Sequence, residues 1–318
     1  MKVLATAAAP KRLLIFIDTD GWAYHRRANA LAKHCADGWQ VTISSVNYLA
    51  SSRPNEFDAV LLLDYAAIGL VRRAVQKPPL IVSFNADAWR RDELFKQVWG
   101  SADYTICVNR ERYERARKHR VCYIPNGVDL DDFHIVAPIP QRPERILWCA
   151  NERVAEIKGW PLAAESRPLL EAEGFECDFR LLRDSADWLK TPCLATWYNS
   201  GGYFLCTSRT EGTANMVMEA AACGCAPVST PVGNFNDWCT STTGVPITDP
   251  SPNGVLAAML VARRYRQLVA NGAAGTMRAQ WNWEQRAKYY FALCAALASG
   301  RTPAPFNYRD CQPEGLAK

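Results

Sequence analysis

The chain has 318 residues, of which 49% are hydrophobic and 22% are charged, and its net charge at pH 7 is +5. This composition excludes a disordered chain, and no apolar run reaches the roughly 18–20 residues that a membrane-spanning helix requires. The length is sufficient for two domains, each with its own core. We therefore expect a globular, cytoplasmic protein of two domains.

The first half of the chain predicts a parallel α/β unit. Small residues over 1–9 could suggest a signal peptide, but Lys11 and Arg12 interrupt the apolar run, so we predict a frayed leader followed by a strand at 13–17. A turn at Gly21 and an amphipathic helix over 22–35 then open a βαβ pattern. Further strands are expected at 40–46, 59–63, 80–84, 104–108 and 122–125. Continuous apolar runs of this kind are typical of parallel strands that are buried on both faces.

The second half repeats the α/β pattern after a proline-rich linker. We predict strands at 145–150, 178–182, 202–207 and 226–230, and helices at 161–173, 215–223, 254–269 and 283–297. The predicted domain bounds are 1–136 for the first domain, 137–144 for the linker, 145–280 for the second domain, 281–299 for a C-terminal helix and 300–318 for a polar tail.

The twelve cysteines are scattered among the predicted strands and helices. In a chain of ordinary enzyme size this distribution favours reduced, mostly buried thiols over a disulfide framework. Cys223 and Cys225 form the only close pair, and neither a second pair nor nearby histidines stand at zinc-site spacing. We therefore assign no metal site.

The densest functional signal lies between residues 207 and 233, where a strand ends in a polar loop and a helix begins near Asn215. In open α/β sheets ligands bind at the carboxyl ends of the strands, and free amide groups at a helix N-terminus attract phosphate. Glu211 lies in the loop and Glu219 lies in the helix, and a carboxylate accepts hydrogen bonds from paired hydroxyls. Two carboxylates at this spacing could hold a sugar and a ribose beside a helix-bound diphosphate. The expected ligand-binding positions around the helix start are Gly212, Thr213, Ala214, Asn215 and Met216.

This segment resembles the donor site of the retaining glycosyltransferases of family 4, or glycosyl transferases group 1, which share the GT-B fold. Glu211 and Glu219 match the family's E-x7-E motif, and Asn215, Pro227 and the flanking glycines match its surroundings. The resemblance implies an α/β GT-B fold with two Rossmann-like domains facing each other across a cleft. The resemblance also implies that Glu211 contacts the transferred sugar and that Glu219 contacts the ribose hydroxyls.

Other segments resemble the family in the expected order. The stretch 123–133, which contains Asn126, is similar to the segment that closes the first domain and faces the cleft. Arg153 and Lys158 match the two basic residues that the family places on the donor phosphates, with a surface Arg/Lys pair as the alternative. Positive charge is needed there because the leaving group departs as a nucleotide diphosphate. The helix over 281–299 is similar to the family's closing helix, which packs back toward the first domain.

The first domain departs from the family pattern at two loops. Gly21 stands alone where the family has paired glycines after the first strand, so this loop would approach the phosphates along a different backbone path. Asn85 and Asp87 follow the fourth strand, where many relatives carry a histidine near the reacting sugar, and either residue could replace its hydrogen bond. The family is described as reacting on one face of the sugar with help from the departing phosphate. We therefore expect no metal and no cofactor besides the nucleotide-sugar donor, UDP-glucose or another NDP-hexose.

Basic charge is concentrated in the first half of the chain. Residues 1–125 carry 19 Lys and Arg against 12 Asp and Glu, a net charge of +7. The arginines group as Arg26-Arg27, Arg72-Arg73, Arg90-Arg91 and within 110–120, with Trp22, Tyr24, Trp89 and Trp99 interleaved. Such a surface is often merely solvated, but arginine and aromatic residues also suit DNA, and phage enzymes that glycosylate hydroxymethylated bases use the GT-B fold.

We accordingly predict transfer of a hexose to a hydroxymethylated pyrimidine in duplex DNA. Two alternatives stay open. One is a glycosyltransferase that acts on a surface glycan or a lipid acceptor, reached through peripheral contact with a membrane. The other is a catalytically inactive protein that binds a sugar nucleotide.

Overall fold

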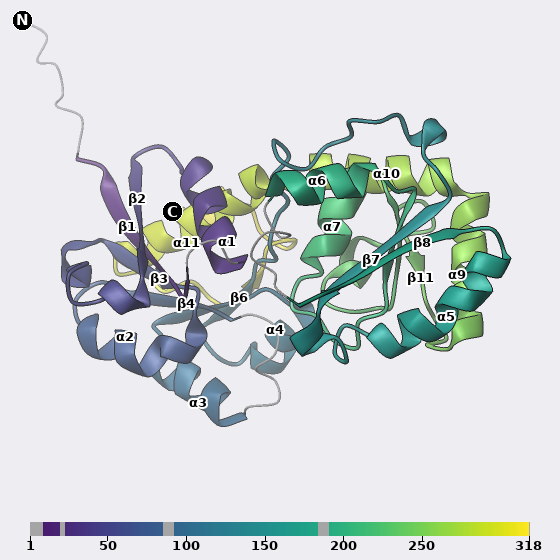
Figure 1. Ribbon diagram of the computed structural model, residues 1–318. Helices are drawn as coiled ribbons and strands as arrows, with labels where there is room; N and C mark the ends of the chain where they lie inside the picture. Colours follow the sequence, from purple (N-terminus) through teal and green to yellow (C-terminus); the bar gives the residue numbers. More distant parts are fainter. Residues whose placement is uncertain (1–8, 20–22, 85–91, 184–190, 318) are drawn as a thin grey trace, which may run out of the picture. The chain divides into compact units, whose positions relative to one another are not determined.

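The computed structural model describes residues 9–19, 23–84, 92–183 and 191–317 (Figure 1). The chain divides into two compact units. Unit 1 comprises Met1–Cys107, Glu111–Ile124 and Arg286–Lys318, and unit 2 comprises Val108–Arg110 and Pro125–Gln285.

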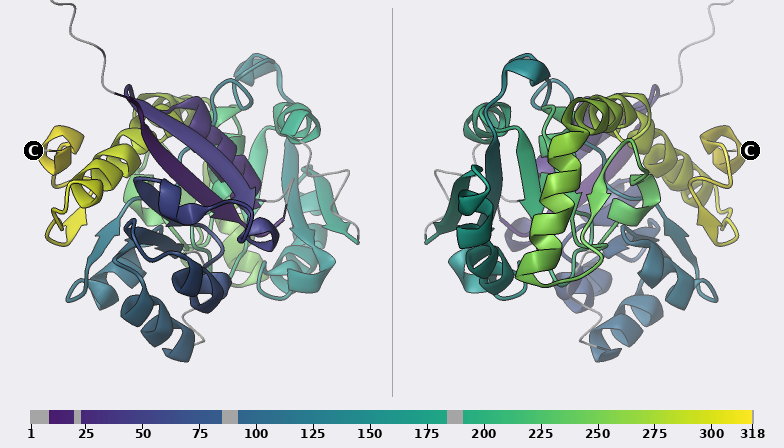
Figure 2. Two further views of the ribbon diagram at one scale, coloured as in Figure 1. Left: turned by 90° about the vertical axis from the view of Figure 1, so that its left-hand side faces the viewer. Right: turned by 90° about the vertical axis from the view of Figure 1, so that its right-hand side faces the viewer.

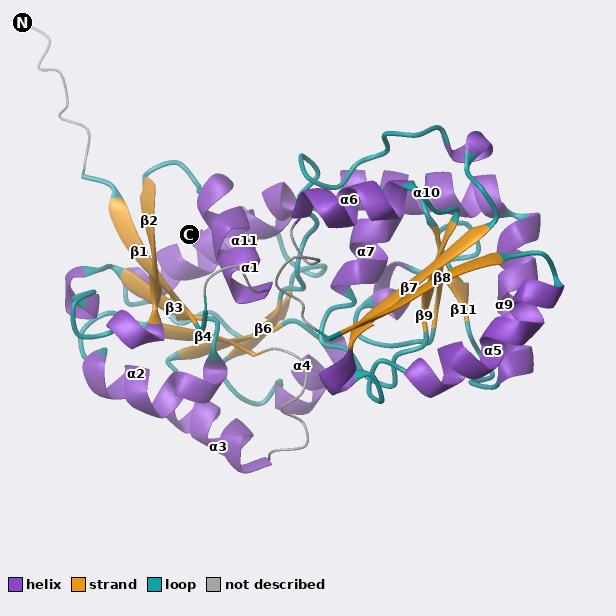
Figure 3. Cartoon of the chain, in the orientation of Figure 1, coloured by secondary structure: helices purple, strands orange, loops and turns teal. Residues whose placement is uncertain are grey.

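Unit 1 is built on a seven-stranded sheet in the order β12-β6-β5-β4-β3-β1-β2, in which every neighbouring pair is parallel (Figure 3). Its strands are β1 (Lys11–Ile17), β2 (Trp39–Ser45), β3 (Ala59–Leu62), β4 (Leu80–Phe84), β5 (Tyr104–Cys107), β6 (Val121–Tyr123) and β12 (Phe306–Asn307). Its helices are α1 (Ala23–Lys33), α2 (Ile68–Ala74), α3 (Asp92–Ser101), most of α4 (Arg110–Ala116) and of α11 (Trp283–Ala298), and α12 (Pro313–Ala317). Every residue of β3 and β4 is buried, as the continuous apolar runs predicted.

The C-terminal segment differs from the polar tail expected over 300–318. Phe306 and Asn307 form β12, which pairs with β6 at the edge of the sheet of unit 1. Phe306 and Tyr308 are each only 8% exposed, and the Tyr308 ring packs edge-on against Tyr123. Two aromatic side chains among polar residues therefore tie this segment into the sheet.

Unit 2 contains a five-stranded parallel sheet in the order β11-β10-β9-β7-β8. Its strands are β7 (Arg145–Asn151), β8 (Glu176–Leu182), β9 (Tyr203–Cys206), β10 (Ala226–Ser229) and β11 (Val245–Pro246). Its helices are α5 (Trp160–Ala172), α6 (Thr191–Asn199), α7 (Asn215–Ala222), α8 (Phe235–Trp238), α9 (Pro252–Arg264) and α10 (Arg266–Ala279). Helix α9 packs on β10, β11 and α5, while α7 packs on β9 and β10 (Figure 2).

The helix predicted over 254–269 is in fact parts of two helices. The chain leaves helical geometry at Tyr265, whose φ and ψ are −115° and 22°, and α10 starts at the next residue. In α10, a Cβ on Gly272 would lie 2.0 Å from the carbonyl oxygen of Thr242. This close approach to a loop far away in the sequence fixes the direction of α10, and local helix propensity does not encode it.

The edge strand β8 carries a fully hydrogen-bonded carboxylate. Asp178 accepts hydrogen bonds from Arg180 Nε at 2.5 Å and from Trp197 Nε1 at 2.7 Å. Burial alone would raise the pKa of Asp178, but the hydrogen bonds from Arg180 and Trp197 outweigh it, so the pKa is lowered from its usual value. Asp178 therefore stabilises unit 2 in its charged form.

All twelve cysteines lie within the described ranges, none forms a disulfide there, and most are buried. Burial raises the pKa of the Cys107, Cys149 and Cys225 thiols to about 12. Among the described helices, none combines the length and the apolar character needed to cross a bilayer.

Candidate active site

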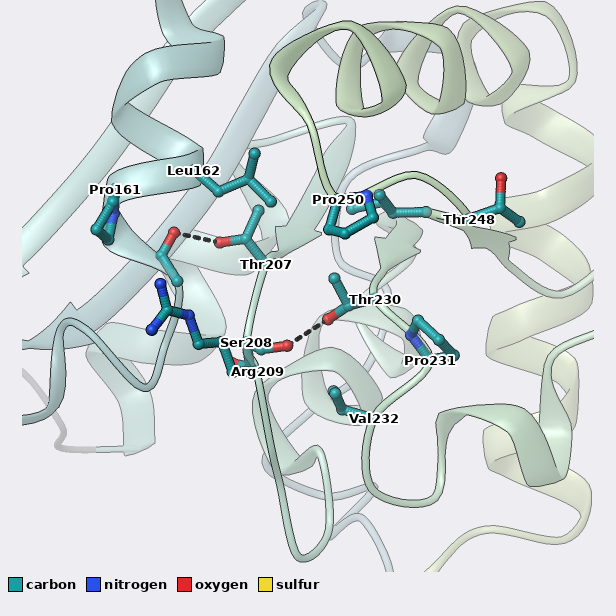
Figure 4. A pocket seen from close by; sticks show the side chains of 12 residues that line it. Pro161, Leu162, Thr207, Ser208, Arg209, Thr230, Pro231, Val232, Thr248 and Pro250 are labelled. Atoms are coloured by element: carbon teal, nitrogen blue, oxygen red, sulfur yellow. Dashed lines mark hydrogen bonds between the residues drawn. The ribbon is translucent and has the colours of Figure 1, made fainter.

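A cavity of about 450 Å³ opens at the carboxyl edge of the sheet of unit 2 (Figure 4). It is lined by residues 207–209 after β9, 230–232 after β10 and 247–248 after β11, and by Pro161 and Leu162 in the first turn of α5. Ligands of parallel α/β sheets bind at this edge because the loops that follow the strands converge there. The cavity is therefore the primary candidate for a ligand site in unit 2.

The loop before α5 lies against the end of β9 because of a glycine. Gly159 has a φ of +74°, and a Cβ at this position would lie 1.9 Å from the carbonyl oxygen of Thr207. A hydrogen bond also joins the two segments, because the Thr207 hydroxyl donates to the Gly159 carbonyl at 2.9 Å (Figure 4). Only glycine allows this approach, which brings Lys158 next to the segment after β9.

Lys158, Ser208 and Glu211 form one hydrogen-bonded group beside the cavity. The Lys158 Nζ lies 2.7 Å and 2.8 Å from the two carboxylate oxygens of Glu211, and the Ser208 hydroxyl donates to Glu211 Oε1 at 2.8 Å. The side chains of Lys158 and Glu211 are 32% and 12% exposed. The structure thus joins the lysine predicted to bind phosphate to the glutamate predicted to contact the sugar.

The backbone of the Glu211 loop is anchored by the short segment that follows β5. Asn109 Nδ2 donates to the Glu211 carbonyl at 3.1 Å, and the Thr213 hydroxyl donates to the Val108 carbonyl at 3.2 Å. We did not single out Asn109 from the sequence. Its signal there was a polar residue directly after a buried strand, at the edge where ligands bind.

A second set of predicted residues meets at the start of α7. Asn126 Nδ2 donates to Asn215 Oδ1 at 3.1 Å, and the Ala214 amide donates to Asn234 Oδ1 at 3.0 Å. Asn126 is 8% exposed, yet its Oδ1 has no hydrogen-bond partner among the residues that the structure describes. A buried acceptor without a donor is costly, so such an atom is suited to receive a ligand hydroxyl.

The remaining predicted positions differ in their surroundings. Gly212, Thr213 and Ala214 are buried in the loop before α7, and Met216 is partly buried in its first turn. Glu219 is 8% exposed, accepts a hydrogen bond from the Tyr198 hydroxyl at 3.1 Å and does not line the cavity. Arg153 is exposed, and no ion pair joins its side chain to another described residue. Gly21, Asn85 and Asp87 lie outside the described residues.

The residues that line the cavity from β10 and β11 were not predicted. Thr230, Pro231 and Thr248 directly follow these strands, and the Thr230 hydroxyl donates to the Ser208 carbonyl at 2.6 Å. Within the part of the chain that the structure describes, no group of three or more His, Cys, Asp or Glu side chains is arranged to hold a metal ion.

The sequence of unit 2 matches a known family. Residues 154–262, which include Lys158, Glu211 and Glu219, match the family model described as Glycosyl transferases group 1. By this match the segment is similar to glycosyl transferases group 1. The resemblance predicted from the motifs is thereby confirmed over this stretch, which covers about a third of the chain. A comparison with curated protein sequences gives no significant match.

Solved structures share the fold over most of the chain. Sucrose-phosphate synthase from Thermosynechococcus elongatus is 14% identical, with a TM-score of 0.67 over 91% of this chain and 100% of that chain. Anabaena Alr3699/HepE in complex with UDP and glucose is 10% identical, with a TM-score of 0.68 over 88% and 98%. The catalytic domain of starch synthase IV from Arabidopsis thaliana, bound to ADP and acarbose, is 11% identical, with a TM-score of 0.68 over 92% and 100%. The predicted α/β GT-B fold with two Rossmann-like domains is confirmed.

Proposed function

We propose that the protein is a glycosyltransferase that uses a nucleotide-sugar donor. The observation that carries this proposal is the hydrogen-bonded group of Lys158, Ser208 and Glu211 beside the cavity at the carboxyl edge of the sheet. The match of this segment to glycosyl transferases group 1 supports the proposal. The UDP and glucose bound to Alr3699/HepE, which shares the fold, agree with it.

The cavity is suited to the nucleoside part of such a donor. Its volume of about 450 Å³ falls within the range of small-molecule sites. Pro231 and Pro250 offer apolar surface to a base (Figure 4). The Thr248 hydroxyl can donate or accept a hydrogen bond there, whereas Thr230, which donates to the Ser208 carbonyl, can still accept one. In our proposal Arg153 and Lys158 hold the diphosphate next to this cavity, together with the positive end of the α7 helix dipole.

Donor binding would rearrange the lysine–glutamate pair. A diphosphate attracts the Lys158 ammonium, which frees the carboxylate of Glu211 to accept hydrogen bonds from sugar hydroxyls. During transfer the bond between the anomeric carbon and the phosphate oxygen breaks, the acceptor oxygen bonds to the same carbon, and the acceptor proton passes to the departing phosphate. Lys158 stabilises the charge that develops on this leaving group. The acceptor bonds on the face from which the phosphate leaves, so the anomeric configuration is retained.

Other residues take supporting roles in the proposal. The unpaired Oδ1 of Asn126 accepts a hydrogen bond from the donor. Glu219 binds the ribose hydroxyls through its carboxylate, of which Oε2 also accepts the hydrogen bond from the Tyr198 hydroxyl. Asn85 or Asp87 replaces the histidine of many relatives, and no metal takes part.

We further propose glucose as the transferred hexose and a hydroxymethylated pyrimidine in DNA as the acceptor. The net charge of +7 over residues 1–125 supports an anionic acceptor. A glycan or lipid acceptor is the second candidate, since the same charge attracts anionic headgroups.

The test is nucleotide release from a panel of UDP-, GDP- and ADP-sugars, with and without duplex DNA that contains 5-hydroxymethylcytosine or 5-hydroxymethyluracil. We expect release of one nucleotide, faster with the modified DNA than with plain DNA, and its loss in Glu211→Gln. Glu171→Gln is the matched control, because the side chain of Glu171 forms an exposed ion pair with Arg167 on α5 and does not line the cavity. Turnover that is indifferent to DNA would refute the DNA acceptor and favour a glycan or lipid, and no turnover with any donor would favour a binding protein.

A further inference from the structure

Unit 1 contains a second cavity, of about 650 Å³, at the amino ends of its parallel strands. It is lined by the C-terminal ends of α2 and α3, by residues that precede β5 and β6, and by Pro305 before β12. These positions lie at the amino ends of parallel strands, away from the carboxyl edge of the same sheet. Every lining residue belongs to unit 1, so the cavity is separate from the proposed donor site.

The charge of this cavity is strongly positive. Of the described residues, Arg72, Lys118, His119 and Arg120 line it, together with one carboxylate, that of Asp103. Asp103 Oδ2 is already satisfied by Arg72 NH1 at 2.9 Å and by the Leu80 amide at 2.7 Å. Lys118 and Arg120 are exposed, and neither forms an ion pair with any described residue. Two uncompensated cations therefore face the cavity.

One wall of the cavity is flat and aromatic. The rings of Trp99 and His119 stack with their centroids 4.3 Å apart and an angle of 13° between their planes. Trp99 is partly buried, whereas His119 is exposed. An exposed imidazole backed by an indole offers a fixed surface on which another planar ring can stack, and the adjacent cations suit a phosphate that is attached to such a ring.

We propose that this cavity binds a nucleotide unit of a single-stranded nucleic acid, with Lys118 and Arg120 on the phosphate and the base stacked on His119. A recessed site of this size admits an unstacked base, whereas a duplex keeps its bases inside. A membrane surface is a poorer match, because none of the lining residues is an exposed large apolar side chain that could enter the lipid. The inference goes beyond the proposed function and does not depend on catalysis.

The experiment is a fluorescence polarisation titration of the full chain with a labelled 12-nucleotide single-stranded DNA over a series of salt concentrations. We expect Lys118→Ala/Arg120→Ala to weaken binding about tenfold or more. The slope of log affinity against log salt should fall by about 0.7, because both cations act on one phosphate and each phosphate neutralised on a single strand contributes about 0.7. The matched control is Arg264→Ala/Arg278→Ala, which removes the same charge from exposed positions in unit 2. It should leave both quantities nearly unchanged.

A second arm tests the base. An abasic strand of the same length and charge should bind about fivefold or more weakly than the normal strand, since stacking contributes about 1–3 kcal/mol per base. Equal affinity for the two strands would refute the stacking of a base on His119. An equal loss of affinity in both double variants would refute the placement of the binding site at Lys118 and Arg120. Binding to vesicles with 20% phosphatidylserine that depends on Lys118 and Arg120, without binding to the oligonucleotide, would overturn the proposal in favour of a membrane contact. Nucleotide release from the donor is measured separately and does not enter any of these binding results, so failure of this proposal is distinguishable from failure of the proposed function.

Discussion

Replacing Lys158 by methionine separates a catalytic lysine from a merely structural one. Methionine is about as long as the lysine stem but carries no charge, so Glu211 would keep only the hydrogen bond from Ser208. The side chains of Lys158 and Glu211 are 32% and 12% exposed, so solvent screens the pair in part, and we take its contribution to the free energy of unfolding as on the order of 1 kcal/mol. The melting temperature should therefore fall by no more than about 4 °C.

The catalytic effect of the same substitution should be much larger. Removing one positioned group that stabilises developing negative charge costs about 2.7–4 kcal/mol, which corresponds to a loss of about 10²–10³ in kcat. We expect this loss in the rate of nucleotide release from the preferred donor, measured by chromatography of the released nucleotide. Lys158→Arg keeps the charge but changes its geometry, and should retain part of the activity.

The control and a double variant complete this test. Lys77→Met, at an exposed position of unit 1, should be as active as the wild-type protein. Lys158 and Glu211 act as one group, so Lys158→Met/Glu211→Gln should lose less activity than the two single losses multiplied together. A value of kcat/KM for Lys158→Met within threefold of wild type would refute the reasoning, and so would a loss that merely tracks a large fall in melting temperature.

Three further predictions concern the scaffold of unit 2. Gly159→Ala should lower the melting temperature well beyond Gly174→Ala. Both positions have positive φ, which costs an alanine about 1–2 kcal/mol, but only at Gly159 does the new Cβ also meet backbone. Asp178→Asn should lower the urea midpoint at pH 7. Because folding lowers the pKa of Asp178, the stabilisation by its carboxylate is complete above the unfolded value of 3.8 and disappears as the pH falls through the lower folded value. The difference in urea midpoint between the variant and wild type should therefore shrink in acid, and a larger difference would contradict us. Asn109→Ala should reduce kcat/KM for nucleotide release by about tenfold, since a hydrogen bond typically contributes about 1 kcal/mol and its loss also displaces the Glu211 loop, and an unchanged kcat/KM would exclude Asn109 as a positioning residue.

The strands of both sheets were largely predictable from the sequence because they are short apolar runs. In β3 and β4 every residue is buried, so hydrophobicity alone marks them. The two-residue strands β11 and β12 escaped prediction because their position depends on partners elsewhere in the chain. The same holds for the break at Tyr265, where a contact between Gly272 and a distant loop turns the chain.

In the candidate site, too, some residues could be predicted from local sequence and others depend on contacts between distant parts of the chain. The resemblance to a known family singled out Lys158 and Glu211 as candidates, and the structure places them within hydrogen-bond distance although 53 residues separate them. The anchoring role of Asn109 and the cavity wall at residues 230–232 depend on which strand ends lie next to each other. The order of the strands is a property of the sheet, and no local pattern specifies it.

The lysine–glutamate pair suggests how the site distinguishes its ligand from other anions. Without a ligand, the positive charge of Lys158 is neutralised by a carboxylate at 2.7 Å, and the Ser208 hydroxyl is also engaged with that carboxylate. An anion can bind Lys158 only by replacing the Glu211 carboxylate, so a monoanion exchanges one ion pair for another and binds with little net free energy. A diphosphate supplies more negative charge, and an attached sugar supplies hydroxyl donors for the carboxylate that is released. A nucleotide sugar offers a new partner to both Lys158 and Glu211, whereas a free nucleotide or a free sugar offers one to only one of them. We therefore infer that the ion pair between Lys158 and Glu211 favours binding of the intact donor over either of its parts.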